Sequence, residues 1–256
     1  MRSVARFALL ALALAGCPAA SRRVPEGAVL LYDVDFSAPE QAVGQEVRVV
    51  ETGVEQKFPS RLPSQIFFGH PTVVAKLCGL EKQPVQLSVA SGQQGQEGLE
   101  FLLDERYGHY HVELDLCVER LEPPTLSGQA VQLAAFLDVA DAYALGFLST
   151  GEIGVIDPIL APETALTPRP VAHFQPGKPM HLAFDVDLEK QTWRIAIDGK
   201  TVSDQKLQAT IPRGVRVVLR GNPANVAAFD NLLVWAEHDL SAPGATPKAP
   251  ITGPEQ

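Results

Sequence analysis

Hydrophobic and polar residues alternate through most of this amino-acid sequence. A clear example lies between positions 180 and 197, where every second residue is apolar on both sides of a short polar break. These apolar residues are Met180, Leu182, Phe184, Val186, Trp193, Ile195 and Ile197. Since successive side chains of a strand point to opposite faces, a period of two predicts strands with one buried and one exposed face.

Turn residues separate the alternating segments. Asp198-Gly199 is a tight-turn pair between two strand candidates, and Thr150-Gly151 turns a second hairpin. No segment carries a helical stripe of twelve or more residues, so we expect an all-β fold in which two antiparallel sheets cover each other as a sandwich. The strand candidates are 28–36, 46–52, 72–77, 85–89, 99–103, 110–121, 131–139, 142–156, 180–187, 192–197, 200–202, 215–219 and 227–236, the last with a bulge within 229–232.

The two ends of the sequence differ from this body. An apolar run at 7–15 follows Arg2 and Arg6, and it is far shorter than the roughly 20 residues that a membrane-spanning helix needs. The last residues are rich in Pro, Gly, Ala and Thr and have little to bury. We expect a signal peptide at 1–16, a lipidated tether at 17–27, one sandwich at 28–237 and a disordered proline-rich tail at 238–256.

The residues Leu14-Ala15-Gly16-Cys17 resemble the lipobox of bacterial lipoproteins. By that resemblance, a signal peptidase cuts before Cys17, and lipid is attached to the new N-terminal cysteine. Several acyl chains anchor a protein firmly to a membrane, whereas one chain binds only marginally. The resemblance implies a protein of the bacterial cell envelope, periplasmic or at the cell surface and anchored to a membrane.

The charge of the sequence argues against nucleic acid as a partner. The formal net charge is −9, and loss of Arg2 and Arg6 with the signal peptide makes it −11. An acidic protein without a basic cluster repels phosphate groups, so we expect no nucleic-acid binding.

Two cysteines remain once Cys17 is lipidated. An even number in an oxidising compartment favours a disulfide between Cys78 and Cys117, although two buried thiols are the alternative. Both cysteines lie in strand-like segments, so their pairing requires those segments to be neighbours.

One strand candidate carries polar residues of unusual chemistry. In GHYHVELDLCVER, residues 108–120, a polar row occupies every second position, and its members are His109, His111, Glu113, Asp115, Cys117 and Glu119. The intervening residues are apolar, so the row is expected to point outward from the sandwich. An exposed face of an antiparallel sheet is normally solvated and needs no ligand. We take His109, His111, Glu113 and Asp115 as candidates to face a ligand.

The segment PGKPMHLAFDVDLEKQTWRIAIDGKTV resembles the strand-and-turn theme of concanavalin A-like jelly rolls, especially laminin-G-like domains. LYDVDFS and AFDNLLVWAE resemble the opening and closing strands of such domains. The resemblance covers most of 28–237 and implies a concanavalin A-like jelly roll. Its motifs describe turns and core faces, so it supports a fold better than a function.

The same resemblance raises a catalytic alternative. Related glycosidases of the laminarinase and lichenase type carry Glu-x-Asp-x-Glu on one strand. Here Glu113 and Asp115 match the first two positions, Cys117 stands at the third, and Glu119 is the next acid. The Cα atoms of Glu113 and Glu119 would lie about 20 Å apart along a strand. Glycosidase carboxyl groups stand within about 10 Å of each other, so the pair needs a bulge to work together.

Metal binding is a further possibility. His109 and His111 could both reach one ion from the same strand face, with Glu113 as a third ligand and His181 or an acid from another strand as a fourth. By resemblance to carbohydrate-binding jelly rolls, Asp35 and Asp230 occupy places suited to structural calcium, an ion that needs six or more oxygen ligands. We expect no other cofactor.

The sequence therefore leads to three functional hypotheses. The first is a lipid-anchored, non-catalytic module that binds a glycan or an envelope protein. The second is a glycoside hydrolase acting on a β-glucan-type polysaccharide, and the third is a structural envelope protein without a small ligand. We expect a non-enzymatic protein.

Overall fold

The computed structural model describes residues 24–48, 65–89, 95–123, 133–135, 144–156, 168–206, 214–221 and 223–241. Within these ranges no helix is long and apolar enough to span a membrane. The expected signal peptide, Cys17 and residues 242–256 of the expected tail lie outside the described residues.

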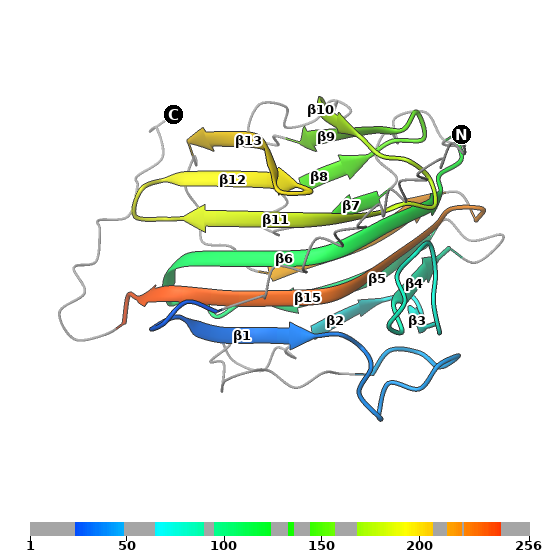
Figure 1. The fold of residues 1–256 in the computed structure, drawn as a ribbon, viewed down its shortest axis with the longest axis horizontal. Helices are drawn as coiled ribbons and strands as arrows, with labels where there is room; N and C mark the ends of the chain where they lie inside the picture. Colours follow the sequence, from blue (N-terminus) through cyan, green and yellow to red (C-terminus); the bar gives the residue numbers. More distant parts are fainter. Residues whose placement is uncertain are drawn as a thin grey trace, which may run out of the picture.

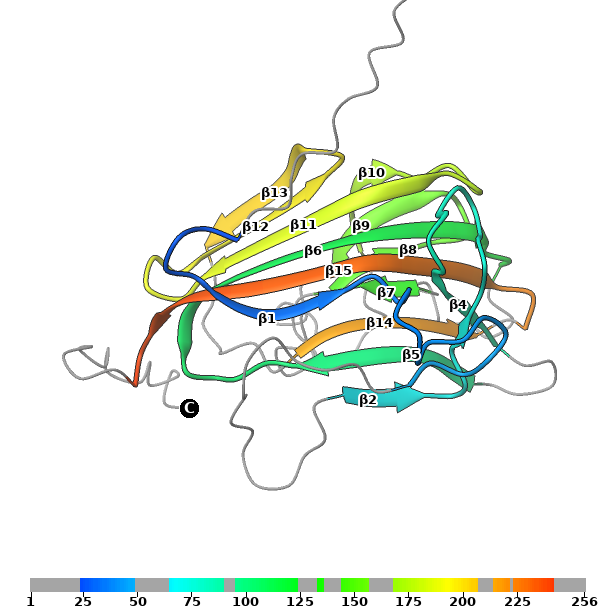
Figure 2. The ribbon, with the colours of Figure 1, turned by 60° about the horizontal axis from the view of Figure 1, so that its bottom comes forward.

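Two antiparallel sheets make up the described part of the protein (Figures 1 and 2). The larger sheet has eight strands there, in the order β13-β12-β11-β6-β15-β4-β3, and β1 also pairs with β15. Its strands are β1 (Val29–Val34), β3 (Thr72–Val73), β4 (Val85–Ser88), β6 (Tyr107–Arg120), β11 (Pro179–Asp187), β12 (Thr192–Ile197), β13 (Lys200–Lys206) and β15 (Val226–Asp239). The long strands β6 and β15 form its centre.

The smaller sheet has seven strands among the described residues, in the order β10-β9-β8-β7-β14-β5-β2. Its strands are β2 (Gln65–Phe68), β5 (Gly95–Leu102), β7 (Leu133–Ala135), β8 (Ala144–Phe147), β9 (Glu152–Ile156), β10 (Arg169–His173) and β14 (Gly214–Gly221). In Figure 1 the larger sheet faces the viewer and the smaller sheet lies behind it.

The core lies between the two sheets because the apolar faces of both point inward. Tyr32 of β1 makes an edge-on contact with Phe101 of β5, with ring centroids 5.4 Å apart. The Tyr32 hydroxyl donates a hydrogen bond of 2.8 Å to the carbonyl oxygen of Leu102 in the opposite sheet. On the larger sheet Phe184 and Trp193 pack together beneath β11 and β12. The predicted all-β, two-sheet antiparallel sandwich is therefore confirmed.

The predicted turns are also confirmed. The hairpin from β8 to β9 turns at Gly151, whose φ of +87° is accessible to glycine. In β15 the pairing with β6 shifts between Asp230 and Leu233, and Asn231 adopts a φ of +54°. This shift is the bulge that the broken alternation at 229–232 predicts.

Several boundaries differ from the prediction. The expected strand at 72–77 ends at Val73, and Glu46 forms only an isolated bridge with Thr72. The strands β2 and β10 escaped prediction, because QIFF does not alternate and RPVAH has only two small apolar residues. The final strand continues to Asp239, two residues beyond the expected end of the sandwich. Residues 49–52, 131–132, 136–139 and 142–143 of three expected strand segments lie outside the described residues.

Candidate functional site

The polar row of β6 lies on the outer face of the larger sheet. The alternate residues Tyr110, Val112, Leu114 and Leu116 are fully buried in the core. His109, His111, Glu113 and Asp115 are partly exposed, as the alternation predicts for the opposite face.

The neighbouring strands place partners beside this row. In β11, Asp185 pairs with His111 and His181 pairs with Asp115. In β15, Trp235 pairs with His111. The polar row is therefore not simply solvated, since side chains of three strands contact one another across it.

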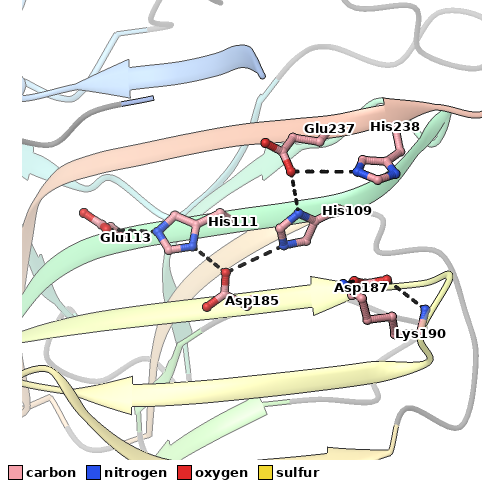
Figure 3. A network of polar contacts seen from close by, with 8 residues as sticks. All are labelled: His109, His111, Glu113, Asp185, Asp187, Lys190, Glu237 and His238. Atoms are coloured by element: carbon pink, nitrogen blue, oxygen red, sulfur yellow. Dashed lines mark hydrogen bonds and ion pairs between the residues drawn. The ribbon is translucent and has the colours of Figure 1, made fainter. Parts of the chain in front are cut away.

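These contacts form a carboxylate–imidazole series in which acids and histidines alternate along the sheet (Figure 3). Each of the three histidines lies between two carboxylates, at nitrogen–oxygen distances from 2.7 to 3.7 Å. In order, the members are Glu237, His109, Asp185, His111, Glu113, His181 and Asp115.

His111 stands at the centre of the series. Its Nδ1 lies 2.7 Å from Asp185 Oδ1, and its Nε2 lies 2.9 Å from Glu113 Oε1. Both ring nitrogens face acceptor oxygens, and only the doubly protonated ring can donate to both. The geometry therefore favours a positively charged His111.

The pKa values follow from this arrangement. Burial lowers the pKa of His111, but the hydrogen bonds to Asp185 and Glu113 outweigh it and raise the pKa to about 9. The hydrogen bond to Asp185 also raises the pKa of His109 against the effect of burial. Burial raises the pKa of Asp185, yet its bonds to the two histidines hold that pKa well below the ordinary value. His111 and Asp185 are thus charged near neutral pH.

Trp235 joins the series on its β15 side. Its ring stacks on His111 at 4.6 Å between centroids and meets His109 edge-on at 5.4 Å. Trp235 is only 9% exposed, so it offers little ring surface to a ligand. It serves as a packing surface for the two histidines, because an imidazolium is attracted to the face of an indole.

Two flanking contacts tie the series to the hairpin ends. Asp187 accepts hydrogen bonds from the backbone N–H of Lys190 at 2.8 Å and from its Nζ at 2.6 Å. His238 lies 3.3 Å from Glu189 and 4.0 Å from Glu237. Figure 3 shows the Asp187–Lys190 and His238–Glu237 pairs at the end of the series near the β11–β12 turn.

The other end of the series is ordered by the β15 bulge. Asp115 Oδ1 lies 2.8 Å from His181 Nδ1, and its Oδ2 accepts a 2.7 Å hydrogen bond from Asn231 Nδ2. Asn231 reaches Asp115 from the bulged position, where its positive φ is one that asparagine tolerates better than most residues. The bulge therefore adds an amide to the acids and imidazoles at this end.

A cleft of about 390 Å³ opens at this end of the series. Its polar walls come from β6, β11 and β15, and a loop after β3 closes another side. The lining residues are Gly79, Leu80, Glu81, Lys82, Asp115, Pro179, Met180, His181, Asp230 and Asn231. The cleft thus combines charged groups, an amide and apolar surface.

The loop wall of the cleft is built on a tight turn, residues 77–80. Leu77 and Leu80 exchange backbone hydrogen bonds of 3.1 and 2.9 Å, and Cys78 and Gly79 between them have φ values of +52° and +81°. Two positive φ angles at the central residues are typical of a type I′ turn. Cys78 is bonded to Cys117 of β6, so the predicted disulfide is confirmed.

The turn also packs against the outer face of the sheet. Leu80 is buried in a small cluster with Cys117 and Ala228. A Cβ atom on Gly79 would stand 3.2 Å from Pro179 Cδ, so the backbone of the turn lies close to β11. The turn therefore contacts all three central strands beside the cleft.

The structure separates the acids of the glycosidase hypothesis. Glu113 contacts His111, whereas Glu119 lies beyond Cys117 with its carboxylate 3.1 Å from Cys78 Sγ. β6 does bulge near Glu119, where Ala227 pairs with Val118 and Val226 with Arg120. The disulfide nevertheless stands beside Glu119, and Glu113 lies in the carboxylate–imidazole series.

The metal hypotheses receive no support from the part of the chain that the structure describes. No group of three or more His, Cys, Asp or Glu there is arranged to hold a metal ion. Asp35 accepts a hydrogen bond from the backbone N–H of Ser37, and the buried Asp230 accepts one from that of Asn231. Both aspartates serve their own backbone turns.

The alternation in β6 predicts the polar row, but of its partners only His181 could be proposed from the sequence. Asp185 and Glu237 alternate with apolar residues in their own strands, and no local signal links them to the histidines. The 77–80 turn begins at the last residue of the expected strand 72–77, and its Cys-Gly pair is a turn signal that could have revealed it.

Comparison with known proteins supports the fold. No protein-family model matches the sequence, and no curated protein matches it. Among solved structures, a Trypanosoma rangeli sialidase in complex with 2,3-difluorosialic acid is similar, with a TM-score of 0.50 and 12% identity over 84% of this chain and 32% of that chain. An alginate lyase from Corynebacterium sp. matches with a TM-score of 0.44 and 9% identity, over 59% of this chain and 76% of that chain. The binding domain of botulinum neurotoxin DC matches with a TM-score of 0.42 and 10% identity, over 68% of this chain and 42% of that chain.

This chain spans between 18% and 32% of the length of the sialidases it matches. At such low identity, the sialidase likeness shows the fold alone. Fold and site together define a β-sandwich with a polar cleft on the outer face of one sheet. The finer resemblance to concanavalin A-like domains stays a prediction.

Proposed function

We propose that this protein is a lipid-anchored β-sandwich of the bacterial cell envelope that binds a glycan in the cleft without turning it over. The observation that carries the proposal is the composition of the cleft. Sugars present hydroxyl groups, which pair with carboxylates and amides, and C–H faces, which need apolar contact. The cleft offers Asp115 and Asn231 for the first and the exposed ring of Pro179 for the second.

The size and order of the cleft support the same proposal. A volume of about 390 Å³ lies within the usual range for small-ligand sites. The Asp115 carboxylate is already oriented by His181 and Asn231, so little side-chain entropy is lost on binding. The solved sialidase of similar fold is described with a sugar derivative bound, which makes glycans the first class to test.

We propose that the protein does not hydrolyse the bound glycan because its acidic residues are held in other contacts. Both oxygens of Asp115 are engaged within the protein, and Glu113 lies between two histidines. Glu119 stands on the far side of the disulfide-bonded Cys117. These contacts favour a binding role for the carboxylates.

A glycan array probed with the full-length, detergent-solubilised protein tests the proposal. Asn231→Gly removes the amide from the cleft and keeps a residue that accepts positive φ, so we expect loss of the glycan signal. Gln191→Gly is the matched control, because Gln191 also has a positive φ but lies in the β11–β12 turn. Equal glycan signals for both variants would exclude the cleft as the binding site. Release of reducing ends from a bound polysaccharide would favour the glycoside hydrolase hypothesis.

The lipid anchor is proposed from the lipobox-like residues that end at Cys17. In a bacterial host supplied with an alkyne-labelled palmitate, the protein should incorporate the label and fractionate with membranes. Cys17→Ala should lose both properties, whereas Cys78→Ala should keep them. A labelled Cys17→Ala protein would refute the anchor.

A further inference from the structure

The wall of the cleft formed by the 77–80 turn has few attachments. Within the described residues, its own backbone bonds are local, joining Leu77 to Leu80 and Gln83 to Ala75. Its packing on the sheet centres on Leu80, which is buried with Cys117 and Ala228, and Leu77 and Cys78 pack against this cluster. Such a small apolar cluster is not enough to hold a turn firmly to a sheet.

The disulfide adds the one covalent attachment described for the turn. It joins Cys78 at the tip of the turn to Cys117 in the middle of the sheet, at a sequence separation of 39. Cys78 is also a non-glycine residue with a positive φ, a conformation that favours glycine and that the surroundings must maintain. Breaking the bond therefore frees a turn whose tip prefers another backbone conformation.

The cleft depends directly on this turn. The residues Gly79, Leu80, Glu81 and Lys82 form one side of it, and Asp115, His181 and Asn231 on the sheet form the other. When the turn moves away, the sheet residues remain but the enclosed space is lost.

We propose that the Cys78–Cys117 disulfide is a redox latch, whose reduction by a dithiol releases the 77–80 turn and abolishes ligand binding in the cleft. The regulatory part of this inference rests on the proposed function of the cleft. The release of the turn on reduction is inferred from the geometry alone and does not depend on the proposed function.

The chemistry follows from the exposure of the two sulfurs. Cys78 is partly exposed and Cys117 is fully buried, so the reductant thiolate attacks Cys78 Sγ. This step forms a mixed disulfide with Cys78, and Cys117 leaves as a thiolate that takes up a proton. The second thiolate of the dithiol then attacks the mixed disulfide, and Cys78 leaves and is protonated in turn. Two electrons pass to the protein, and the dithiol becomes a disulfide.

Glu119 controls access to this reaction. Its carboxylate lies 3.1 Å from Cys78 Sγ, so its negative charge stands close to the sulfur that a thiolate attacks. Two like charges about 4 Å apart in water repel each other enough to slow a reaction about fivefold. We therefore expect Glu119→Gln to accelerate reduction by dithiothreitol about fivefold. Glu105→Gln, which removes an exposed acid in the turn before β6, is the control and should leave the rate unchanged.

Hydrogen exchange on the full-length protein, oxidised and reduced with dithiothreitol, tests the latch. We expect amides within 77–83 to exchange about tenfold faster or more after reduction through local opening of the turn, while those of β11 and β12 accelerate only as far as the loss of global stability dictates. Cys78→Ala should reproduce the reduced pattern without reductant. Unchanged exchange at 77–83, or equal loss of protection in β11 and β12, would overturn the latch.

The glycan array completes the test when both redox forms are applied to it. Signal from the oxidised protein that disappears on reduction supports control of binding by the latch. Binding that survives while 77–83 exchanges freely would overturn that control and leave the proposed function intact. Absence of signal in both forms would refute the proposed function and with it the regulatory step, and hydrogen exchange would still decide the release of the turn.

Discussion

The charged state of His111 makes the stability of the protein depend on pH. Its pKa rises from the ordinary 6.5 to about 9 in the folded protein. A group whose pKa is raised by folding contributes its full stabilisation below the unfolded value, and that contribution is lost as the pH rises through the folded value. Stability should therefore fall between pH 6.5 and pH 9.

The size of this effect follows from the same two values. Each pH unit between them corresponds to about 1.4 kcal/mol, so the contribution of His111 is about 3 kcal/mol. His111 is 14% exposed, so solvent screens its ion pairs only in part. The pKa of His109 is raised as well, and His109 adds to the slope in the same direction.

Urea unfolding at a series of pH values from 5.5 to 9.5 measures the slope. His111→Gln should lower the free energy of unfolding at pH 6 by about 3 kcal/mol and should remove most of its decline above pH 6.5. The exposed His238→Gln is the matched control and should behave like the unsubstituted protein. A flat pH profile in the unsubstituted protein, or an unchanged slope in His111→Gln, would refute the reasoning.

Tryptophan fluorescence reports the same titration directly. Of the two tryptophans, Trp235 stacks on His111 and Trp193 is buried in the core. A fluorescence change centred near pH 9 and absent from His111→Gln is expected, because loss of the imidazolium charge alters the environment of the indole. A midpoint near 6.5 would show that the ion pairs do not stabilise the charged ring.

Three further changes test the fold by chemical denaturation. Tyr32→Phe should lower the free energy of unfolding by about 1 kcal/mol, because it removes the buried hydrogen bond between the sheets. An unchanged free energy of unfolding would show that this bond contributes nothing. Gly98→Ala should lower the free energy of unfolding by about 3 kcal/mol, since a Cβ atom there would overlap the carbonyl oxygen of Val217. Gly108→Ala, whose Cβ would have its nearest contact at 3.3 Å, should lower it less. Cys78→Ala should lower the free energy of unfolding by about 2–5 kcal/mol, and reductant should then have no further effect.

The faces of the strands could be predicted from the sequence because they depend on local alternation. Val112 and Leu114 point inward and His111 and Glu113 outward, as the period of two requires. The break in the alternation at 229–232 likewise predicts the bulge at Asn231. These features needed no knowledge of which strands are neighbours.

Apart from His181, the partners of the polar row could not be predicted, because they depend on register between distant strands. Asp185 lies 74 residues from His111, and only the pairing of β11 with β6 brings them together. A shift of one residue in that register would place an apolar side chain beside the histidine. The cleft could not be predicted either, since the turn that forms one of its walls packs on strands that are distant from it in sequence.

The bulge at Asn231 also limits how this protein can change by insertion and deletion. Before it, Phe229 points into the core, and after it Leu232 and Val234 do so, which means that the extra residue exchanges the two faces of β15. Deleting one residue there would send Trp235 and Glu237 into the sandwich interior and bring core side chains out to water. The bulge therefore determines which residues of β15 face the core. Substitutions in this segment can be tolerated, but an insertion or deletion cannot.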